Sequence, residues 1–360
     1  MAAGAIAGAA VGVLHAARAA GAYLAASEAS AATIADEDAP GPAPAIVPLP
    51  RGELVVAPPA PPAPPPAPTV FGAPDAELLA PLGAAKVTRV KLNQGGTTIS
   101  LRLDFANGAR AAFKPEQVNL QSDPRREIAA YRLDRLLELG RVPPAKAGAV
   151  PLADVLAGID PAVRGAVAER LRAEVIARDG VVHGELSWWI PQIKYARIGP
   201  FWAEDPDARA LWVGYLQIGA QIPPAVRPLI EGMAACLVFD VLTDNADRWS
   251  GNNIVVSPDD KILYVMDNTM SFSTSRIGFE MNAGILRRVQ VFPRGLVARI
   301  RALTEEKLAA ALEGGGGDTR LGRLLSPQEI RAVIDRRDNL VKYIDQLIAA
   351  HGEQAVLAFP

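Results

Sequence analysis

The chain has 360 residues, of which 50% are apolar and 6% aromatic, and its 37 basic and 39 acidic side chains give a formal net charge of −2. This length suffices for one two-lobed domain or two small ones, and the near-neutral charge excludes the broad basic field that binds nucleic acid. The single cysteine, Cys236, excludes an intrachain disulfide and a cysteine-based zinc site. The histidines are scattered at His15, His183 and His351, which argues against a histidine-driven hydrolase.

The first 75 residues lack the pattern of a folded core. Residues 1–26 are rich in alanine and glycine, and two interpretations stay open: a weak membrane anchor or signal region, or a plain Ala-rich leader. Residues 27–75 are rich in proline and alanine and are predicted to form a stiff, disordered linker. We expect one globular domain over 76–360. Localisation stays open between a membrane-anchored or exported protein and a cytoplasmic one.

The globular part begins with strand signals. A first strand is predicted over 87–92. In the next run, apolar residues alternate with polar ones, as in a half-buried strand: Ile99, Leu101, Leu103 and Phe105. Asn107-Gly108 is typical of a tight hairpin turn, after which residues 109–114 form the returning strand.

From Pro124 the pattern becomes helical, with Asp123 as a candidate cap. From about Leu152 we expect mainly helix, interrupted by a short apolar stretch at 188–193 and by one later hairpin. The fold class predicted is α+β, with a small β-rich N-lobe followed by a larger, mainly helical C-lobe.

The strongest chemical signal lies around Asp247. Asn252 follows it by five positions, and two apolar runs at 254–256 and 262–266 then predict a hairpin that ends on Asp267. At about 3.3 Å per strand residue, the outward and returning strands nearly cancel, so Asp267 should lie beside Asp247 and Asn252. Carboxylate and amide oxygens are suitable ligands for Mg²⁺ or Mn²⁺. Phosphoryl transfer uses such a set: an acceptor-side carboxylate, a metal carboxylate and a metal-binding amide.

A second candidate group precedes it in the chain. Lys114 ends a strand, where its charge can neutralise nucleotide phosphates if a carboxylate holds it in place. Glu127, thirteen residues further on and in the first turns of the next helix, is the expected partner. Gly95 and Gly96 can bring backbone N–H groups close to phosphate, but this signal is weak, because two glycines in a hairpin usually mean only a turn.

Taken together, these motifs resemble the atypical secretory-pathway kinases, the family of the Golgi casein kinase and Four-jointed. The resemblance extends over roughly 87–279. It is carried by Ala112-Phe113-Lys114-Pro115, by residues 127–136, 141–144 and 239–248, and by Asp267-Asn268 with Phe272 beyond. It implies a two-lobed, protein-kinase-like fold. It also implies ATP with Mg²⁺ or Mn²⁺ as cofactors and transfer of a phosphoryl group to a hydroxyl.

Motif matching implies a role for each candidate residue. Lys114 would contact the phosphates, and Glu127 would pair with it or help to bind metal. Asp247 would be the catalytic base, and Asp267 a metal ligand. Asn252 fits the Four-jointed and phosphoinositide-kinase style, in which an asparagine follows the catalytic aspartate.

Several alternatives stay open. The chain could be a nucleotide-binding pseudokinase that acts as an interaction module, or a HipA-like or phosphoinositide-kinase-like enzyme. The same pocket could also transfer AMP to a hydroxyl. The expected partner is a hydroxyl-bearing acceptor, a protein Ser/Thr or a glycan, with no nucleic acid and with weak membrane association of the N-terminal segment.

Overall fold

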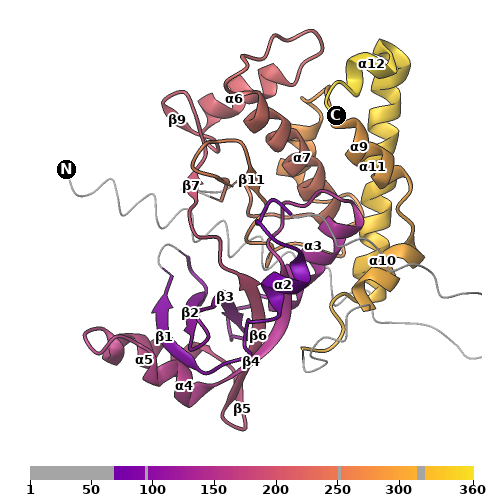
Figure 1. Cartoon of the computed structure of the whole chain (residues 1–360). Coiled ribbons are helices and arrows are strands. Elements are labelled where there is room, and N and C mark those ends of the chain that lie inside the picture. The colour runs from indigo at the N-terminus through magenta and orange to yellow at the C-terminus, as the bar shows by residue number, and fades with distance from the viewer. Residues whose placement is uncertain (1–68, 94–95, 250–252, 314–320) are drawn as a thin grey trace, which may run out of the picture. The chain divides into compact units, whose positions relative to one another are not determined.

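The computed structural model of the chain describes residues 69–93, 96–249, 253–313 and 321–360 (Figure 1). The predicted leader and nearly all of the predicted linker lie outside these residues, so both stay predictions. Within the described residues, we find no helix with the length and apolar character needed to cross a membrane. All of the described residues belong to one compact unit, residues 64–360.

An antiparallel six-stranded sheet forms the first part of this unit. Its strand order is β1-β2-β3-β6-β4. The short strand β5 pairs with residues 181–182 of β6, beyond the part of β6 that pairs with β3. The alternation predicted between 99 and 105 is observed as the alternating burial of β2, and Gly108 has the positive φ of 83° that the β2–β3 turn requires. The strands are β1 (Val87–Leu92), β2 (Leu101–Phe105), β3 (Arg110–Pro115), β4 (Ala145–Pro151), β5 (Ala177–Arg178) and β6 (Val181–Trp188).

Strand β6 differs from the expectation of mainly helix from about Leu152 onward. Every residue from 182 to 186 in β6 is buried, so this strand lacks the alternation that reveals a strand with one exposed face. Gly184 is required there, because a Cβ at this position would come within 2.3 Å of the backbone oxygen of Lys114. Apolar periodicity fails where both faces of a strand are covered.

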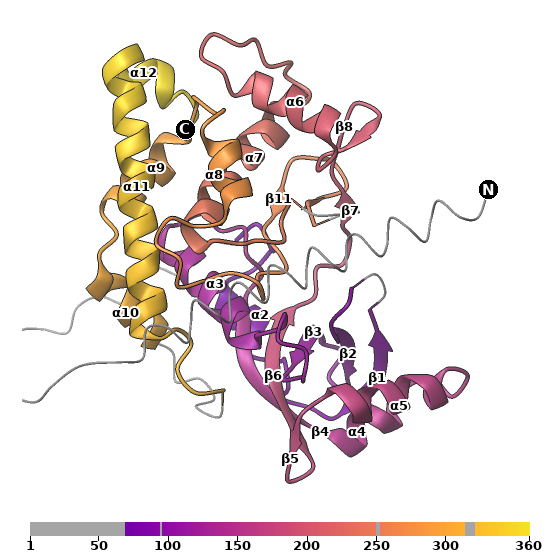
Figure 2. The same cartoon turned by 180° about the vertical axis from the view of Figure 1, so that it is seen from behind.

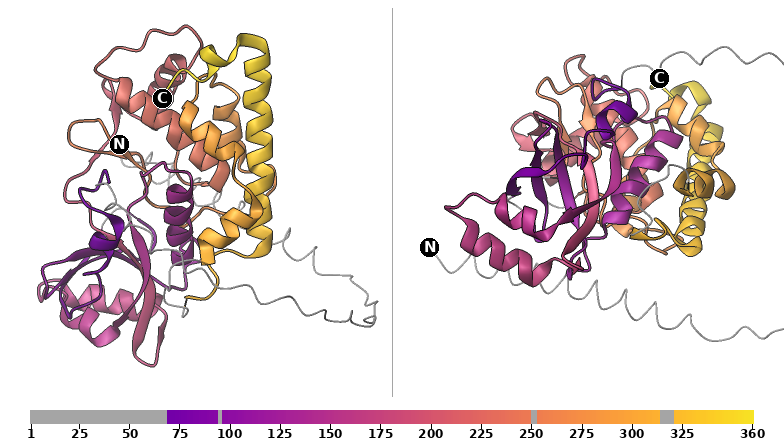
Figure 3. Two further views of the ribbon diagram at one scale, coloured as in Figure 1. Left: turned by 45° about the vertical axis from the view of Figure 1, so that its right-hand side comes forward. Right: turned by 60° about the horizontal axis from the view of Figure 1, so that its bottom comes forward.

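Helix α3 (Pro124–Leu136) begins as predicted, with the side chain of Asp123 accepting a hydrogen bond from the backbone N–H of Arg125. It packs on β4 and β6 on one side and on α10 (Glu305–Glu313) on the other. Figure 3 shows α3 between the sheet and the C-terminal helices. The helix therefore carries its first turn, with Glu127, to the boundary between the two parts.

A larger helical part follows. At its centre is α7 (Arg227–Thr243), which is apolar on nearly every side and buried in the main hydrophobic core. The long helix α11 (Pro327–His351) packs against it (Figure 2). The remaining helices are α2 (Asp75–Leu79), α4 (Leu152–Ala157), α5 (Arg164–Glu174), α6 (Pro206–Tyr215), α8 (Glu280–Leu286), α9 (Arg294–Arg301) and α12 (Glu353–Val356).

The chain passes from the sheet to the helical part through residues 189–193, between β6 and β7 (Lys194–Tyr195) (Figure 1). The predicted late hairpin forms as β10 (Val255–Val256) and β11 (Leu263–Tyr264), and β7 pairs with β10 as a third strand. A further two-stranded hairpin consists of β8 (Arg197–Ile198) and β9 (Phe201–Trp202). An antiparallel sheet followed by a larger helical part agrees with the predicted fold class.

Candidate active site

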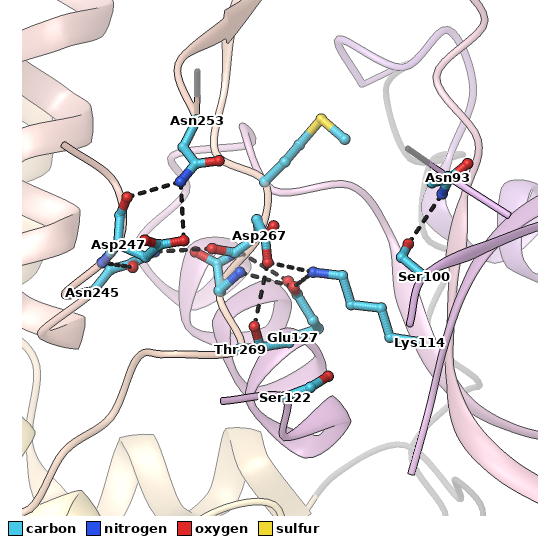
Figure 4. A network of polar contacts seen from close by, with 12 residues as sticks. Asn93, Ser100, Lys114, Ser122, Glu127, Asn245, Asp247, Asn253, Asp267 and Thr269 are labelled. Carbon is cyan, nitrogen blue, oxygen red and sulfur yellow. Dashed lines mark hydrogen bonds and ion pairs between the residues drawn. The ribbon is translucent and has the colours of Figure 1, made fainter. Parts of the chain in front are cut away.

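Lys114 lies where the sheet, α3 and the segment after β11 meet. Its Nζ is 2.5 Å from Oε1 of Glu127 and 2.6 Å from Oδ1 of Asp267 (Figure 4). Only 12% of the Lys114 side chain and 9% of the Glu127 side chain are exposed. Burial opposes the charge on Lys114, but the carboxylates of Asp267 and Glu127 outweigh it and raise its pKa. The predicted lysine–glutamate pair is therefore present, with a second carboxylate on the same cation.

Glu127 uses both of its carboxylate oxygens. Oε1 accepts from Lys114 and also, at 2.8 Å, from the backbone N–H of Asn268. Oε2 accepts from Nδ2 of Asn268 at 3.1 Å. The glutamate thus connects the strand-end lysine to the residue that follows Asp267.

Asp267 has a φ of 58°, a left-handed backbone conformation that is uncommon outside glycine and that tends to be retained at functional sites. Its side chain is 51% exposed, and the charge of Lys114 lowers its pKa, so the carboxylate is ionised at neutral pH. Oδ1 also accepts from the hydroxyl of Thr269 at 3.3 Å. This combination leaves an accessible, charged carboxylate beside Lys114.

Asp247 is placed by two asparagines. Its backbone N–H donates to Oδ1 of Asn245 at 3.0 Å, while Nδ2 of Asn253 donates to its backbone oxygen at 2.8 Å and to its Oδ2 at 3.0 Å. Nδ2 of Asn245 in turn donates to the backbone oxygen of Asp267 at 3.1 Å. The two aspartates are therefore linked through Asn245, and Figure 4 shows them in one network with Lys114 and Glu127.

The remaining predicted positions are only partly described. Asn252 and Gly95 lie outside the described residues, so their roles stay predictions. Gly96 lies in the connection between β1 and β2, where a Cβ would meet only the backbone of Thr98 at 3.8 Å and beyond. Its close approach to phosphate therefore also stays a prediction.

Glu185 is a residue of this region that sequence reasoning missed. It lies directly opposite Lys114 in the β3–β6 register, so the two side chains share one face of the sheet. The residue is 1% exposed, and its Oε1 has no hydrogen-bond partner within the described structure. Burial, and next to it the charge of Glu127, raises the pKa of Glu185 to about 8. A glutamate in an apolar run would have been a signal only if that run had been identified as a strand beside β3.

The residues that could hold a metal ion are few in the described part of the chain. Among the residues that the structure describes, there is no group of three or more His, Cys, Asp or Glu side chains that could hold a metal ion. Magnesium, however, is commonly bound through one or two carboxylates together with nucleotide phosphates and water, rather than by an all-protein cage. An accessible, ionised Asp267 fits that mode of binding.

Comparison with known proteins supports the fold. No protein-family model matches the chain. Over 80 residues it is 38% identical to human "Extracellular serine/threonine protein kinase FAM20C", a match that covers 19% of this chain and only 14% of that protein. The chain thus matches a small fraction of its curated relative.

Three solved structures resemble most of the chain. The crystal structure of the Golgi casein kinase superposes with a TM-score of 0.63 at 15% identity, over 79% of this chain and 77% of that one. The Golgi casein kinase with Mn and ADP bound gives 0.60 at 15%, over 79% and 78%. Hydra Fam20 with sugar gives 0.59 at 16%, over 77% and 90%. The chain therefore has the kinase-like fold of these proteins, and the predicted resemblance is confirmed at the level of the fold.

Proposed function

We propose that this chain is an ATP-dependent phosphotransferase that moves the γ-phosphoryl group to a hydroxyl acceptor. The observation that carries the proposal is the contact of Lys114 with both Glu127 and Asp267. A buried cation beside an ionised, accessible carboxylate is what the binding of phosphates together with a metal ion requires. The names of the similar proteins, a serine/threonine protein kinase and a casein kinase with Mn and ADP bound, describe the same chemistry. A pseudokinase is less well supported, because the lysine, the glutamate and both aspartates are all present.

Each residue then has a role that its contacts permit. Lys114 would bind the phosphates and neutralise their charge, while Glu127 holds the ammonium group in place. Asp247, fixed by Asn245 and Asn253, would orient the acceptor hydroxyl and receive its proton. Asp267, with Asn252, would hold Mg²⁺ or Mn²⁺, which when bound supplies neutralisation of the developing charge on the phosphates.

A protein serine or threonine is the first acceptor to test, because the human relative is named for that activity. A glycan is the second, because hydra Fam20 was solved with sugar. An exported protein would match the word "extracellular" in the name of the human relative. The N-terminal segment could supply that export or a weak membrane anchor.

The test uses the purified full chain with ATP and MnCl₂ or MgCl₂, in parallel against protein, peptide and glycan mixtures. ATP labelled at the γ-phosphate is compared with ATP labelled at the α-phosphate, and the Asp247→Asn variant is the matched control. We expect label from the γ-position alone, and none with the variant. Transfer of α-label would instead indicate AMP transfer. Tight binding of Mn–ATP without any transfer would favour the pseudokinase.

A further inference from the structure

A network of buried polar contacts connects the middle of the helical part to the strand that carries Lys114. Its central member, Asn268, is fully buried and is bonded at both ends of its amide. Oδ1 accepts from Nη2 of Arg248 at 3.0 Å, whereas Nδ2 donates to Oε2 of Glu127 at 3.1 Å. An amide, with one acceptor end and one donor end, fits between a cation and a carboxylate, and a carboxylate at this position would not.

Arg248 extends this network of contacts into the helical part. It is 1% exposed and pairs through Nε with Asp240 of α7 at 3.0 Å. Nη1 donates to the backbone oxygen of Met266 and, at 3.3 Å, to that of Asn253. Burial opposes its charge, but Asp240 outweighs it and raises the pKa of Arg248, so the guanidinium stays protonated.

Arg248 contacts residues that neighbour Asp267 and residues that hold Asp247. Met266 and Asn268 stand immediately before and after Asp267, and Asn253 is the residue whose amide holds Asp247. Arg248 itself is the neighbour of Asp247 in the chain. One buried cation therefore contacts the residues on both sides of Asp267, through the backbone oxygen of Met266 and the side chain of Asn268. It also contacts the backbone of Asn253, which holds Asp247.

Glu127 extends this arrangement across the boundary between the two parts. Because the glutamate shares its oxygens between Lys114 and Asn268, any displacement of Asn268 removes two of its three described hydrogen bonds. The sequence of contacts is Asp240, Arg248, Asn268, Glu127, Lys114.

We propose that Asn268 and Arg248 are positioning residues that make the phosphate-binding lysine and the acceptor-side aspartate adopt their working positions together. This proposal rests on the proposed function for its consequences in turnover. The linkage between the two parts can be measured without any activity. Neither residue needs to touch the substrate, since both act through Glu127 and through the backbone oxygens of Asn253 and Met266.

Three variants test the linkage. Asn268→Asp keeps the shape but places a carboxylate against Glu127, Asn268→Ala removes the bridge, and Arg248→Lys keeps the charge but loses the multidentate geometry. Asp134→Asn is the matched control. Asp134 is fully buried on the same helix as Glu127, but it accepts from the backbone of Arg141 and Val142 instead. The control therefore perturbs α3 without breaking the chain of contacts.

Amide hydrogen exchange of each full-length variant, without nucleotide, is the first measurement. In the Asn268 variants we expect faster exchange in both 110–128 and 243–249, two segments far apart in sequence. In Asp134→Asn, the increase should be confined to the region around 134–142. Faster exchange restricted to 265–269 in the Asn268 variants would overturn the proposal. This arm is decisive even if the chain binds no ATP, in which case only the proposed function fails.

Turnover is the second measurement, with the acceptor that the labelling experiment identifies or with water. We expect kcat/KM for ATP to fall about tenfold to a hundredfold in Asn268→Ala and Arg248→Lys, the range for the loss of a charge-assisted hydrogen bond. Combination of Asn268→Ala with Lys114→Met should give little further loss, because both act on one unit. If Asn268→Ala lowers the thermal midpoint as much as Asp134→Asn does but leaves kcat/KM within about twofold of wild type, the role is only structural and the proposal is wrong.

Discussion

Lys114 and Asp267 are separated by 153 positions in the sequence, yet the lysine Nζ lies 2.6 Å from Oδ1 of the aspartate. The contact joins the end of β3 to the segment that follows β11, and so joins the sheet to the helical part. Each charge neutralises the other in the absence of a nucleotide. Arrival of phosphates and a divalent cation would supply each residue with a new partner, so ligand binding and rearrangement of this pair should be coupled.

The first prediction concerns Lys114 and Glu127. Lys114→Met and Glu127→Gln should each lower kcat/KM for ATP by about tenfold or more, because each disrupts a charge-assisted contact of low exposure. The double variant should be much less impaired than the product of the two single effects. Steady-state kinetics, with circular dichroism to check folding, measures this. Full activity of Lys114→Met would remove the residue from the site.

The second prediction separates binding from catalysis. Asp247→Asn should reduce turnover by about a hundredfold to ten-thousandfold, while Mn–ATP affinity changes little, because the metal ligand is retained. Asp267→Asn should weaken Mn–ATP binding itself, since a neutral amide is a poorer ligand for a hard cation. Isothermal titration with ATP, with and without Mn²⁺, distinguishes the two. The opposite pattern would exchange the two roles. If neither turnover nor Mn–ATP affinity changes in either variant, these aspartates only stabilise turns.

The third prediction concerns Glu185 and pH. Its pKa is raised from an ordinary 4.5 to about 8 in the folded protein, chiefly by burial. Between these two values the carboxyl is protonated when folded but ionised when unfolded, so the free energy of unfolding should decrease as pH rises through this window. Glu185→Gln retains the shape without the ionisation. The variant should therefore match wild type near pH 5 and exceed it near pH 9, by an amount on the order of a few kcal/mol.

Urea unfolding of both proteins at pH 5, 7 and 9 measures this difference. Glu280→Gln, at a side chain that is 81% exposed, is the control and should leave the pH dependence of stability unchanged. Parallel pH curves for wild type and Glu185→Gln would show that the carboxyl titrates normally in the folded state.

The fourth prediction tests the domain boundary. Removal of residues 1–68 should leave the thermal midpoint unchanged, because that stretch lacks a core-forming pattern. Removal of residues 1–76 should lower it, because Phe71 stacks on Tyr264 with ring centroids 5.9 Å apart and also contacts Trp188 edge-on at 5.8 Å. Calorimetry of the two shortened chains compares them. Loss of cooperative unfolding in the longer one would show that the leader packs on the domain.

Local pattern and spacing predicted a substantial part of this arrangement. The helix cap at Asp123, the pairing of Lys114 with Glu127, and the hairpin that returns the chain to Asp267 each depend on residues near one another in sequence. They needed only strand and helix geometry to be found.

The rest depends on tertiary packing. Strand β6 is buried on both faces, so its sequence has no alternation, and Glu185 could not be placed opposite Lys114 without it. Asn245, Asn253 and Asn268 were equally inaccessible to prediction. An amide in a polar loop gives no indication of which carboxylate or carbonyl it will meet, and these partners are fixed only once the loops are packed together.

The guanidinium of Arg336, from the middle of α11, is buried and donates to the backbone oxygens of Leu242, Ser273 and Ser275. The first of these precedes Asp247 in the chain, and the other two follow Asp267. Arg336 thus holds the backbone just before and just after the segment that contains the two aspartates. Chimeras that join residues 1–326 of this chain to the C-terminal part of a relative should consequently have a lower thermal midpoint unless the helix that replaces α11 has an arginine at this position. In the evolution of such proteins, helix α11 and the aspartate segment are expected to change together.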